Sequence, residues 1–147
     1  MKTLINSWNQ DERIIWRALR SLRECILKND QERMQILEGL SSTRSSSSST
    51  ATSVDVWIIR LLQDYPASDL IQGQCARVVG TLSFGNDIFR RKVGEKQILS
   101  YFVRAMKEFL QAEDTTVLLH LCTAVTNLTH GSHENRSRYV SFFSQNI

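Results

Sequence analysis

The stretch "LIQGQCARVVGTLSFGNDIFRRKV", residues 70–93, decides the fold because it has a counterpart later in the chain. The counterpart is "TVLLHLCTAVTNLTHGSHENRSRY", residues 116–139. An offset of 46 residues, from 76 to 122, aligns similar or identical side chains in the two stretches. The aligned pairs are Ala76 with Cys122, Val79 with Val125, Leu82 with Leu128, Gly85 with Gly131 and Arg90 with Arg136. A fixed period of this size is typical of helical solenoids.

The chain as a whole predicts helices and no strands. Apolar residues recur every three or four positions, and strand-like alternation is not evident. One proline, Pro66, and six glycines leave few helix breakers. Asp69 is expected to cap the helix that follows it. We therefore predict an all-α fold, with helices over residues 11–26, 29–38, 54–65, 69–84, 86–93, 96–110, 114–129 and 133–143.

Three of these helices have well-defined apolar stripes, which predict their buried faces. The residues that we expect to be buried are Ile15, Ala18, Leu19, Leu22 and Ile26 in the first helix, Val54, Trp57, Ile58, Leu61 and Leu62 in the second, and Ile71, Cys75, Val78, Val79 and Leu82 in the third.

The run of Ser and Thr over residues 41–53 interrupts the first copy of the repeat. Each period contains a long helix, a polar turn with Gly and Asn, a short helix and another long helix. Residues 94–97 bridge the last junction in the second copy, and the Ser/Thr run occupies the same place in the first. Long surface loops cost little closure entropy. We therefore expect residues 1–147 to form one domain, with 41–53 as a flexible insertion loop.

The pattern of these copies resembles the armadillo-repeat family. The residues that carry the resemblance are "TAVTNLTHGSHENRSRYV", "ARVVGTLSFGNDIFRRKVGEKQI" and "ILEG…VDVWIIRLL", and it extends over about residues 11–143. HEAT repeats are the nearest alternative, but they lack the short helix. The resemblance implies a right-handed α-solenoid of three-helix repeats, about two to two and a half in number. Roughly three such units are usually needed for stability, so we expect a fragment or a short form with capped ends.

Composition excludes several classes of function. The net charge is +3 over 147 residues, and the basic residues are not concentrated as in a nucleic-acid-binding face. The N-terminus has no signal-peptide core, and no apolar run reaches the length of a membrane span. Cys25, Cys75 and Cys122 are widely spaced in apolar surroundings, which predicts buried free thiols. We expect a cytoplasmic protein, or a nuclear one.

No catalytic or metal-binding motif is present in the sequence. His120, His130 and His133 are close together, but no carboxylate or cysteine completes a ligand set at suitable spacing. A nucleophile elbow and a phosphate-binding glycine loop are also missing. We therefore expect no enzymatic activity, no cofactor and no metal. An enzyme would require a convergent polar pocket around His120 or His130.

The armadillo resemblance implies a peptide-binding groove along the long helices. In that family an Asn near the end of the helix binds the backbone of a peptide, whose unpaired N–H and C=O groups a side-chain amide can satisfy. The corresponding positions here are Asn127, Thr81 and Ser21, and the positions four residues earlier are Thr123, Arg77 and Arg17. The predicted groove residues are Arg13, Arg17, Ser21, Gln74, Arg77, Thr81, His120, Thr123 and Asn127.

These residues also indicate the chemistry of a partner. Import receptors of the family use a ladder of Trp and Asn to bind basic signals, but Trp is absent from the ladder positions here. A groove with Arg13, Arg17 and Arg77 favours an acidic or phosphorylated segment instead. The alternative is that these arginines are solvated or lie across the apolar surface.

The first functional hypothesis is therefore a non-catalytic scaffold or adaptor that binds a segment of another protein on its concave face. The second is a structural one, in which the chain is the capping end of a longer armadillo or HEAT solenoid, or an oligomerisation segment. Tyr139, Phe142 and Phe143 are expected to pack on a following repeat, so self-association through this C-terminal edge is possible. The Ser/Thr run is either a phosphorylation-regulated segment or a tolerated loop.

Overall fold

A computed structural model describes residues 2–29, 31, 33, 35 and 54–146. Within these residues the chain forms helices and contains no strand, which confirms the all-α prediction for the part described. The Ser/Thr run over 41–53 and most of the predicted helix over 29–38 lie outside the described residues. The helices are α1 (Lys2–Lys28), α3 (Val54–Asp64), α4 (Asp69–Ser83), α5 (Asp87–Glu95), α6 (Ile98–Gln111), α7 (Thr115–Thr129) and α8 (His133–Asn146).

The N-termini of α4 and α7 are capped by side chains at equivalent positions. The Ser68 Oγ accepts a hydrogen bond from the Ile71 N–H at 3.3 Å, and the Asp114 carboxylate accepts one from the Val117 N–H at 3.1 Å. The prediction that Asp69 is the cap of α4 is wrong by one residue, because Asp69 already lies in the first turn. The hydroxyl of Ser68 provides the acceptor that an N-cap requires.

The turns after α4 and α7 are also equivalent. Gly85 and Gly131 both have positive φ angles, of 66° and 67°, a conformation that glycine adopts without a steric penalty. Each turn is followed by a polar cap: the Asn86 side chain accepts from the Phe89 N–H, and the Ser132 Oγ accepts from the Asn135 N–H. Consequently α4 and α7 have the same length, 15 residues, and their first residues, 69 and 115, are 46 positions apart.

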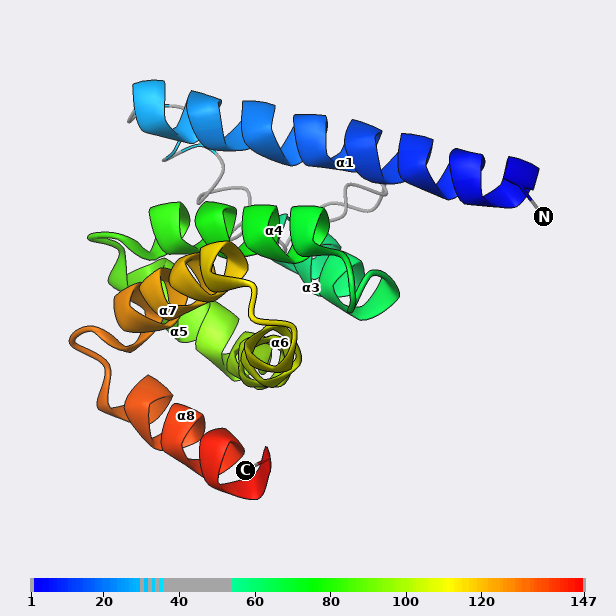
Figure 1. The fold of residues 1–147 in the computed structure, drawn as a ribbon. Coiled ribbons are helices and arrows are strands. Elements are labelled where there is room, and N and C mark those ends of the chain that lie inside the picture. The colour runs from blue at the N-terminus through cyan, green and yellow to red at the C-terminus, as the bar shows by residue number, and fades with distance from the viewer. Residues whose placement is uncertain (1, 30, 32, 34, 36–53, 147) are drawn as a thin grey trace, which may run out of the picture.

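The helices α1, α4 and α7 lie in successive positions and run in the same direction. Figure 1 shows α1 across the top, α4 beneath it and α8 at the opposite end of the molecule. The helix α4 contacts α1 on one side and α7 on the other. The helix α6 packs against both α7 and α8. The three helices thus form a row in which α4 lies between α1 and α7.

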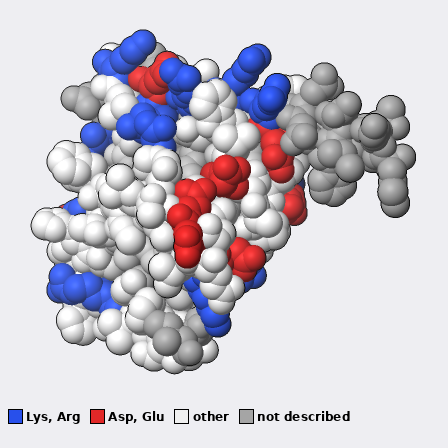
Figure 2. Space-filling model, in the orientation of Figure 1, with Lys and Arg blue, Asp and Glu red and all other residues white. Residues whose placement is uncertain are grey.

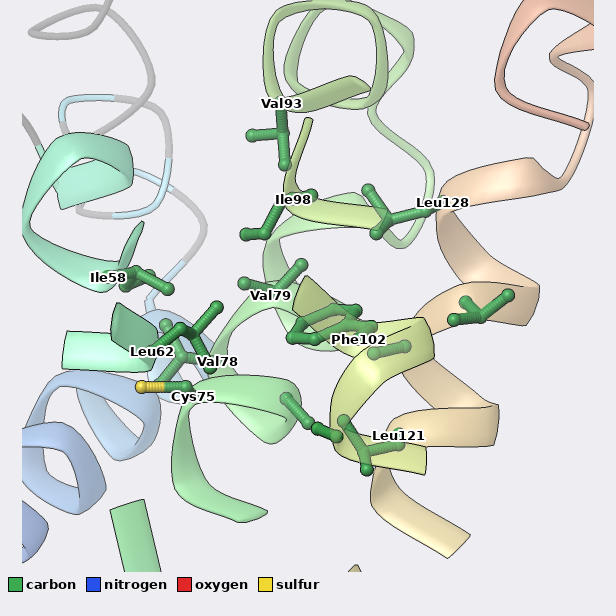
Figure 3. Close-up of a cluster of buried hydrophobic side chains, with 14 of the residues drawn as sticks. Ile58, Leu62, Cys75, Val78, Val79, Val93, Ile98, Phe102, Leu121 and Leu128 are labelled. Carbon is green, nitrogen blue, oxygen red and sulfur yellow. The ribbon is translucent and has the colours of Figure 1, made fainter. Parts of the chain in front are cut away.

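The core extends through the described helices as a single cluster (Figure 3). The predicted stripe of α4 is confirmed, because all five of its side chains are fully buried. In the first helix Leu19 and Ile26 are buried, whereas Ala18 is exposed, contrary to the prediction. Among the cysteines only Cys75 is buried, and burial raises the pKa of its thiol. The prediction of buried thiols is wrong for Cys25 and Cys122, which are exposed.

A buried amide connects α5 and α8. Asn135 is fully buried, and its Nδ2 atom donates to the carbonyl oxygens of Arg90 and Leu128, each at 2.9 Å. The Asn135 Oδ1 accepts from the Arg138 guanidinium at 3.0 Å. Gly94 lies directly against this amide, and a Cβ atom there would overlap the Asn135 Oδ1 and lie 2.7 Å from its Cγ. The close approach of α5 to α8 therefore depends on a residue without a side chain at position 94.

Candidate functional site

A surface hollow of about 420 Å³ lies between α1, α4 and α7. We call it the arginine hollow, because Arg23 of α1, Arg77 of α4 and Arg33 all line it. The remaining lining side chains come from the same three helices and from the residue that follows α4: Ile26, Leu27, Ala76, Gly80, Thr81, Phe84, His120, Thr123 and Asn127. Each of the three parallel helices therefore contributes to one concave surface.

Arg23 has a hydrogen-bond donor that is buried from solvent. Its Nε atom is buried, and no acceptor among the described residues bonds to it. Burial lowers the pKa of the Arg23 guanidinium below its usual value, the Arg77 cation lowers it further, and Glu24 acts in the opposite direction. Glu24 is paired with Arg20 through a hydrogen bond of 3.0 Å. Arg23 thus lines the hollow with a guanidinium whose buried Nε has no acceptor among the described residues.

The same two arginines also affect the pKa of His120 on α7. Burial lowers the pKa of its imidazole, and the Arg77 and Arg23 cations lower it further, while Asp114 raises it. The positive charges of α1 and α4 therefore act on a side chain of α7. Lys and Arg side chains, with acidic ones among them, are visible over the C-terminal half of α1 in Figure 2.

A second hollow of about 320 Å³ adjoins the first and shares Arg77 and His120 with it. We call it the tryptophan hollow, because Trp16 lines it. When the Gln74 amide is oriented with its oxygen towards these donors, it accepts from the Trp16 Nε1 at 3.0 Å and from the Arg77 Nη1 at 3.3 Å. The two hollows together form a trough that follows α4 and α7. Asp69 and Asp114 line its other end.

The polar side chains predicted to bind a peptide backbone are partly engaged within the protein. The Asn127 Nδ2 donates to the Gly80 carbonyl oxygen at 3.0 Å, and the Thr81 and Thr123 hydroxyls donate to carbonyl oxygens within their own helices. The oxygen atoms of these side chains are left to accept hydrogen bonds. The Asn127 amide is therefore suited to accept from a ligand N–H, and its own N–H groups are not fully available for a ligand carbonyl.

The structure brings six of the nine predicted groove residues together. Arg77, Thr81, His120, Thr123 and Asn127 line the arginine hollow, and Gln74 lines the tryptophan hollow. The three residues predicted on the first helix, Arg13, Arg17 and Ser21, are exposed and line neither hollow.

The first helix contributes Arg23 and Leu27 in place of the predicted residues. Arg23 lies one helical turn from both Leu19 and Ile26, which are buried, so it borders the apolar stripe of α1. The sequence contained this signal. Arg23 is a basic residue that flanks the buried positions, but the alignment of "WRALRSL" with the later copies does not select it. Trp16, Arg33 and Phe84 also line the trough and were not predicted.

Metal-binding and membrane-spanning features are missing from the described residues. In this part of the chain, no group of three His, Cys, Asp or Glu side chains has an arrangement that could hold a metal ion. No helix within the described ranges combines the length and the apolar character needed to cross a membrane. Comparison of the chain with models of protein families, with curated proteins and with solved structures gives no match. The geometry of the trough is therefore the basis for a functional proposal.

Proposed function

We propose that this chain is a non-catalytic, armadillo-like interaction module that binds an extended segment of a partner protein in the trough formed by α1, α4 and α7. The observation that carries the proposal is that side chains of three parallel helices line one hollow. A rigid concave surface of this kind reduces the ordering cost of binding, because the surface is formed before the partner arrives.

The equivalence of α4 and α7 supports the armadillo-like part of the proposal. The two helices have equal lengths, equivalent N-caps and equivalent glycine turns at an offset of 46 residues, from 69 to 115. The short helix α5 follows the first of these turns, and the longer α6 follows α5. This order is the one that the sequence resemblance implies for a right-handed solenoid of about two to two and a half repeats. The proposed compartment is the cytoplasm or the nucleus, where thiols such as the exposed Cys25 and Cys122 remain reduced.

Selection of peptides with the purified protein tests the proposal. The affinity of peptides enriched from a displayed random library is measured for the unmodified protein and for Thr81→Trp. This substitution places a large ring in the arginine hollow. Thr126→Trp is the matched control, because the Thr81 and Thr126 hydroxyls each donate to the carbonyl four residues earlier at 2.8 Å, and Thr126 lines neither hollow.

We expect Thr81→Trp to weaken binding of the selected peptides by about tenfold or more, which corresponds to about 1.4 kcal/mol. The control variant should bind them as the unmodified protein does. If the two variants bind the peptides equally well, or if the library yields no specific binder, the proposed trough is not a binding site for protein segments.

A second candidate function is self-association or continuation of the solenoid through an apolar face on α7 and α8. Leu119, Val140 and Phe143 are 64%, 60% and 43% exposed, which leaves large apolar side chains of both helices in contact with solvent. The centroid of the Tyr139 ring lies 5.7 Å from that of the Phe143 ring. Burial raises the pKa of the Tyr139 hydroxyl, and the proximity of Cys122 raises it further.

The oligomeric state in solution tests this second candidate. Sedimentation of the protein over a range of concentrations should show dimers, and Leu119→Glu should shift the equilibrium to monomers because it introduces charge into the apolar face. Ile88→Glu is the control, since Ile88 is 55% exposed on α5, outside this face. A protein that is monomeric at every concentration contradicts self-association and leaves the peptide-binding proposal unaffected.

A further inference from the structure

Positive charge gathers in the arginine hollow. Arg23, Arg33 and Arg77 line it together with His120, and none of the described residues that line it is an Asp or a Glu. Two arginines outside the hollow, Arg20 and Arg90, have acidic partners, which are Glu24 and Asp87. The lowered pKa values of Arg23 and His120 have the repulsion from Arg77 among their causes. An anionic ligand would relieve this repulsion.

One of the arginines that line the hollow, Arg23, also has a buried hydrogen-bond donor. The buried Arg23 Nε has no bonding partner among the described residues. Leaving such a donor unsatisfied costs roughly 1 to 3 kcal/mol. The Arg77 guanidinium uses its Nη1 atom on Gln74 and has further N–H groups available. Guanidinium groups from two helices, those of Arg23 and Arg77, thus line one concave surface.

This combination favours a phosphoryl group over a carboxylate. A carboxylate carries one charge and two oxygens, and one guanidinium suffices to pair with it. A phosphoryl group carries nearly two charges and three strong acceptor oxygens, so it can engage Arg23 and Arg77 together. His120 becomes protonated more readily beside a dianion and then supplies another donor.

Apolar side chains next to the arginines indicate that the phosphoryl group belongs to a protein segment. Leu27 and Phe84 line the same hollow and are 57% and 68% exposed, so they provide contacts for hydrophobic neighbours of a phosphorylated residue. The trough continues past Arg77 towards Trp16 and Val117, which gives room for residues on the other side.

We infer that Arg23, Arg77 and His120 form a binding site for a phosphorylated Ser or Thr side chain of the partner segment, flanked by a hydrophobic residue that packs on Leu27 and Phe84. The inference rests on the proposed function, because it assigns a partner chemistry to the same trough. It differs from the arginine-lined groove predicted around Arg13 and Arg17, since those two residues line neither hollow.

Fluorescent pools of degenerate short peptides test the inference. The three pools have phosphoserine, serine or glutamate at a fixed central position, and binding is followed by fluorescence polarisation. We expect the phosphoserine pool to bind about tenfold more tightly than the serine pool, with the glutamate pool between them. Arg23→Gln and Arg77→Gln should each weaken binding of the phosphoserine pool by about tenfold.

Arg104→Gln is the matched control, because it removes the same charge from an exposed arginine on α6 that lies over the Tyr101 ring and lines neither hollow. It should change the affinity by less than about twofold. Circular dichroism checks that every variant is folded. A control variant that weakens binding as much as Arg23→Gln, or equal binding of the phosphoserine and serine pools, would overturn the inference.

Two further measurements probe the chemistry of the ligand. Phenyl phosphate added to the unmodified protein should shift the NMR signals of the His120 ring and raise its pKa, and unchanged signals contradict the site. Anionic lipid vesicles and single-stranded RNA are tested in parallel, and binding of either without binding of the phosphoserine pool also overturns the inference. If Thr81→Trp weakens binding of the peptides selected from the random library while phosphoserine gives no advantage, the phosphate site fails and the proposed function stands.

Discussion

At the scale of single residues, one amide determines how closely α5 and α8 pack. Asn135 of α8 donates to carbonyl oxygens of two other helices, those of Arg90 in α5 and Leu128 in α7. The resemblance of the sequence to armadillo repeats included this Asn, but its role was not predictable, because an Asn in a polar stretch such as "HENRSR" is usually exposed. Its burial becomes evident only when the helices are brought together.

Asn135→Ala should lower the free energy of unfolding by roughly 3 kcal/mol, because it removes two buried hydrogen bonds between helices. Urea denaturation followed by circular dichroism measures the change. Asn127→Ala is the comparison, since Asn127 is only partly buried and donates one hydrogen bond, to Gly80, so its loss should cost about 1 kcal/mol. Equal effects of the two substitutions would contradict the structural role assigned to Asn135.

Substitution of glycine by alanine should have opposite effects on stability at two positions within helices. A Cβ atom at Gly73 of α4 would lie 3.7 Å from side chain atoms of Val117 and His120, which is ordinary contact. Gly73→Ala should therefore raise the free energy of unfolding by about 0.5 to 1 kcal/mol, because alanine favours the helix. Gly94→Ala should lower it by about 2 kcal/mol, because the new methyl group overlaps the Asn135 side chain.

Thermal denaturation of both glycine variants under identical conditions gives the measurement. The expected result is a higher midpoint for Gly73→Ala and a lower one for Gly94→Ala. A double variant, Gly94→Ala with Asn135→Ala, provides a check. Its loss of stability should be smaller than the sum of the two single losses, because the overlap disappears with the larger side chain.

At the scale of elements, the sequence predicted the interior of each helix better than its ends. The stripe of α4 was assigned correctly because its apolar period is regular and all of its members are buried. The start of α1 was missed, since the helix begins at Lys2, where the apolar period is weak. The cap of α4 was misplaced by one residue because both Ser68 and Asp69 are good capping residues.

The sequence alignment also placed α1 incorrectly relative to α4, so it selected the wrong residues of α1 for the site. Local sequence similarity aligned Arg17 with Arg77, whereas the packing of α1 on α4 brings Arg23 to the hollow that Arg77 lines. The apolar stripe of α1 places Arg23 at the border of the buried face, but the residues of α4 that it meets depend on how the apolar side chains of the two helices interdigitate. The helices α4 and α7 were aligned correctly because their turns and caps repeat at the same offset.

NMR titration of His120 tests the register of α1 relative to α4. Arg23 is among the cations that lower the pKa of the His120 imidazole, so Arg23→Gln should raise that pKa towards the usual value of about 6.5. Arg17→Gln removes the same charge from an exposed position on the same helix and should leave the pKa of His120 within about 0.1 of its value in the unmodified protein. A larger rise for Arg17→Gln than for Arg23→Gln would show that α1 is placed in the wrong register.

At the scale of the whole molecule, the all-α class followed from composition and periodicity, whereas the concave site depends on the arrangement of three helices. Leu19 and Ile26 of α1 belong to the same buried cluster as Leu121 and Leu128 of α7. The helices that line the trough therefore share one core. This continuity predicts that α1 unfolds together with the rest of the chain and not as a separate element.

A variant in which Trp16 is the sole tryptophan, made by Trp8→Phe and Trp57→Phe, reports on α1 directly. Because Trp16 lines the trough beside Gln74 of α4, its fluorescence should change only when α1 separates from α4. We expect its urea transition to coincide with that of the circular dichroism signal, which reports all helices. The matched variant retains Trp57 and carries Trp8→Phe and Trp16→Phe. A Trp16 transition at clearly lower urea, with the Trp57 transition unchanged, would mean that α1 detaches first, and the trough would then lack the wall that holds Arg23.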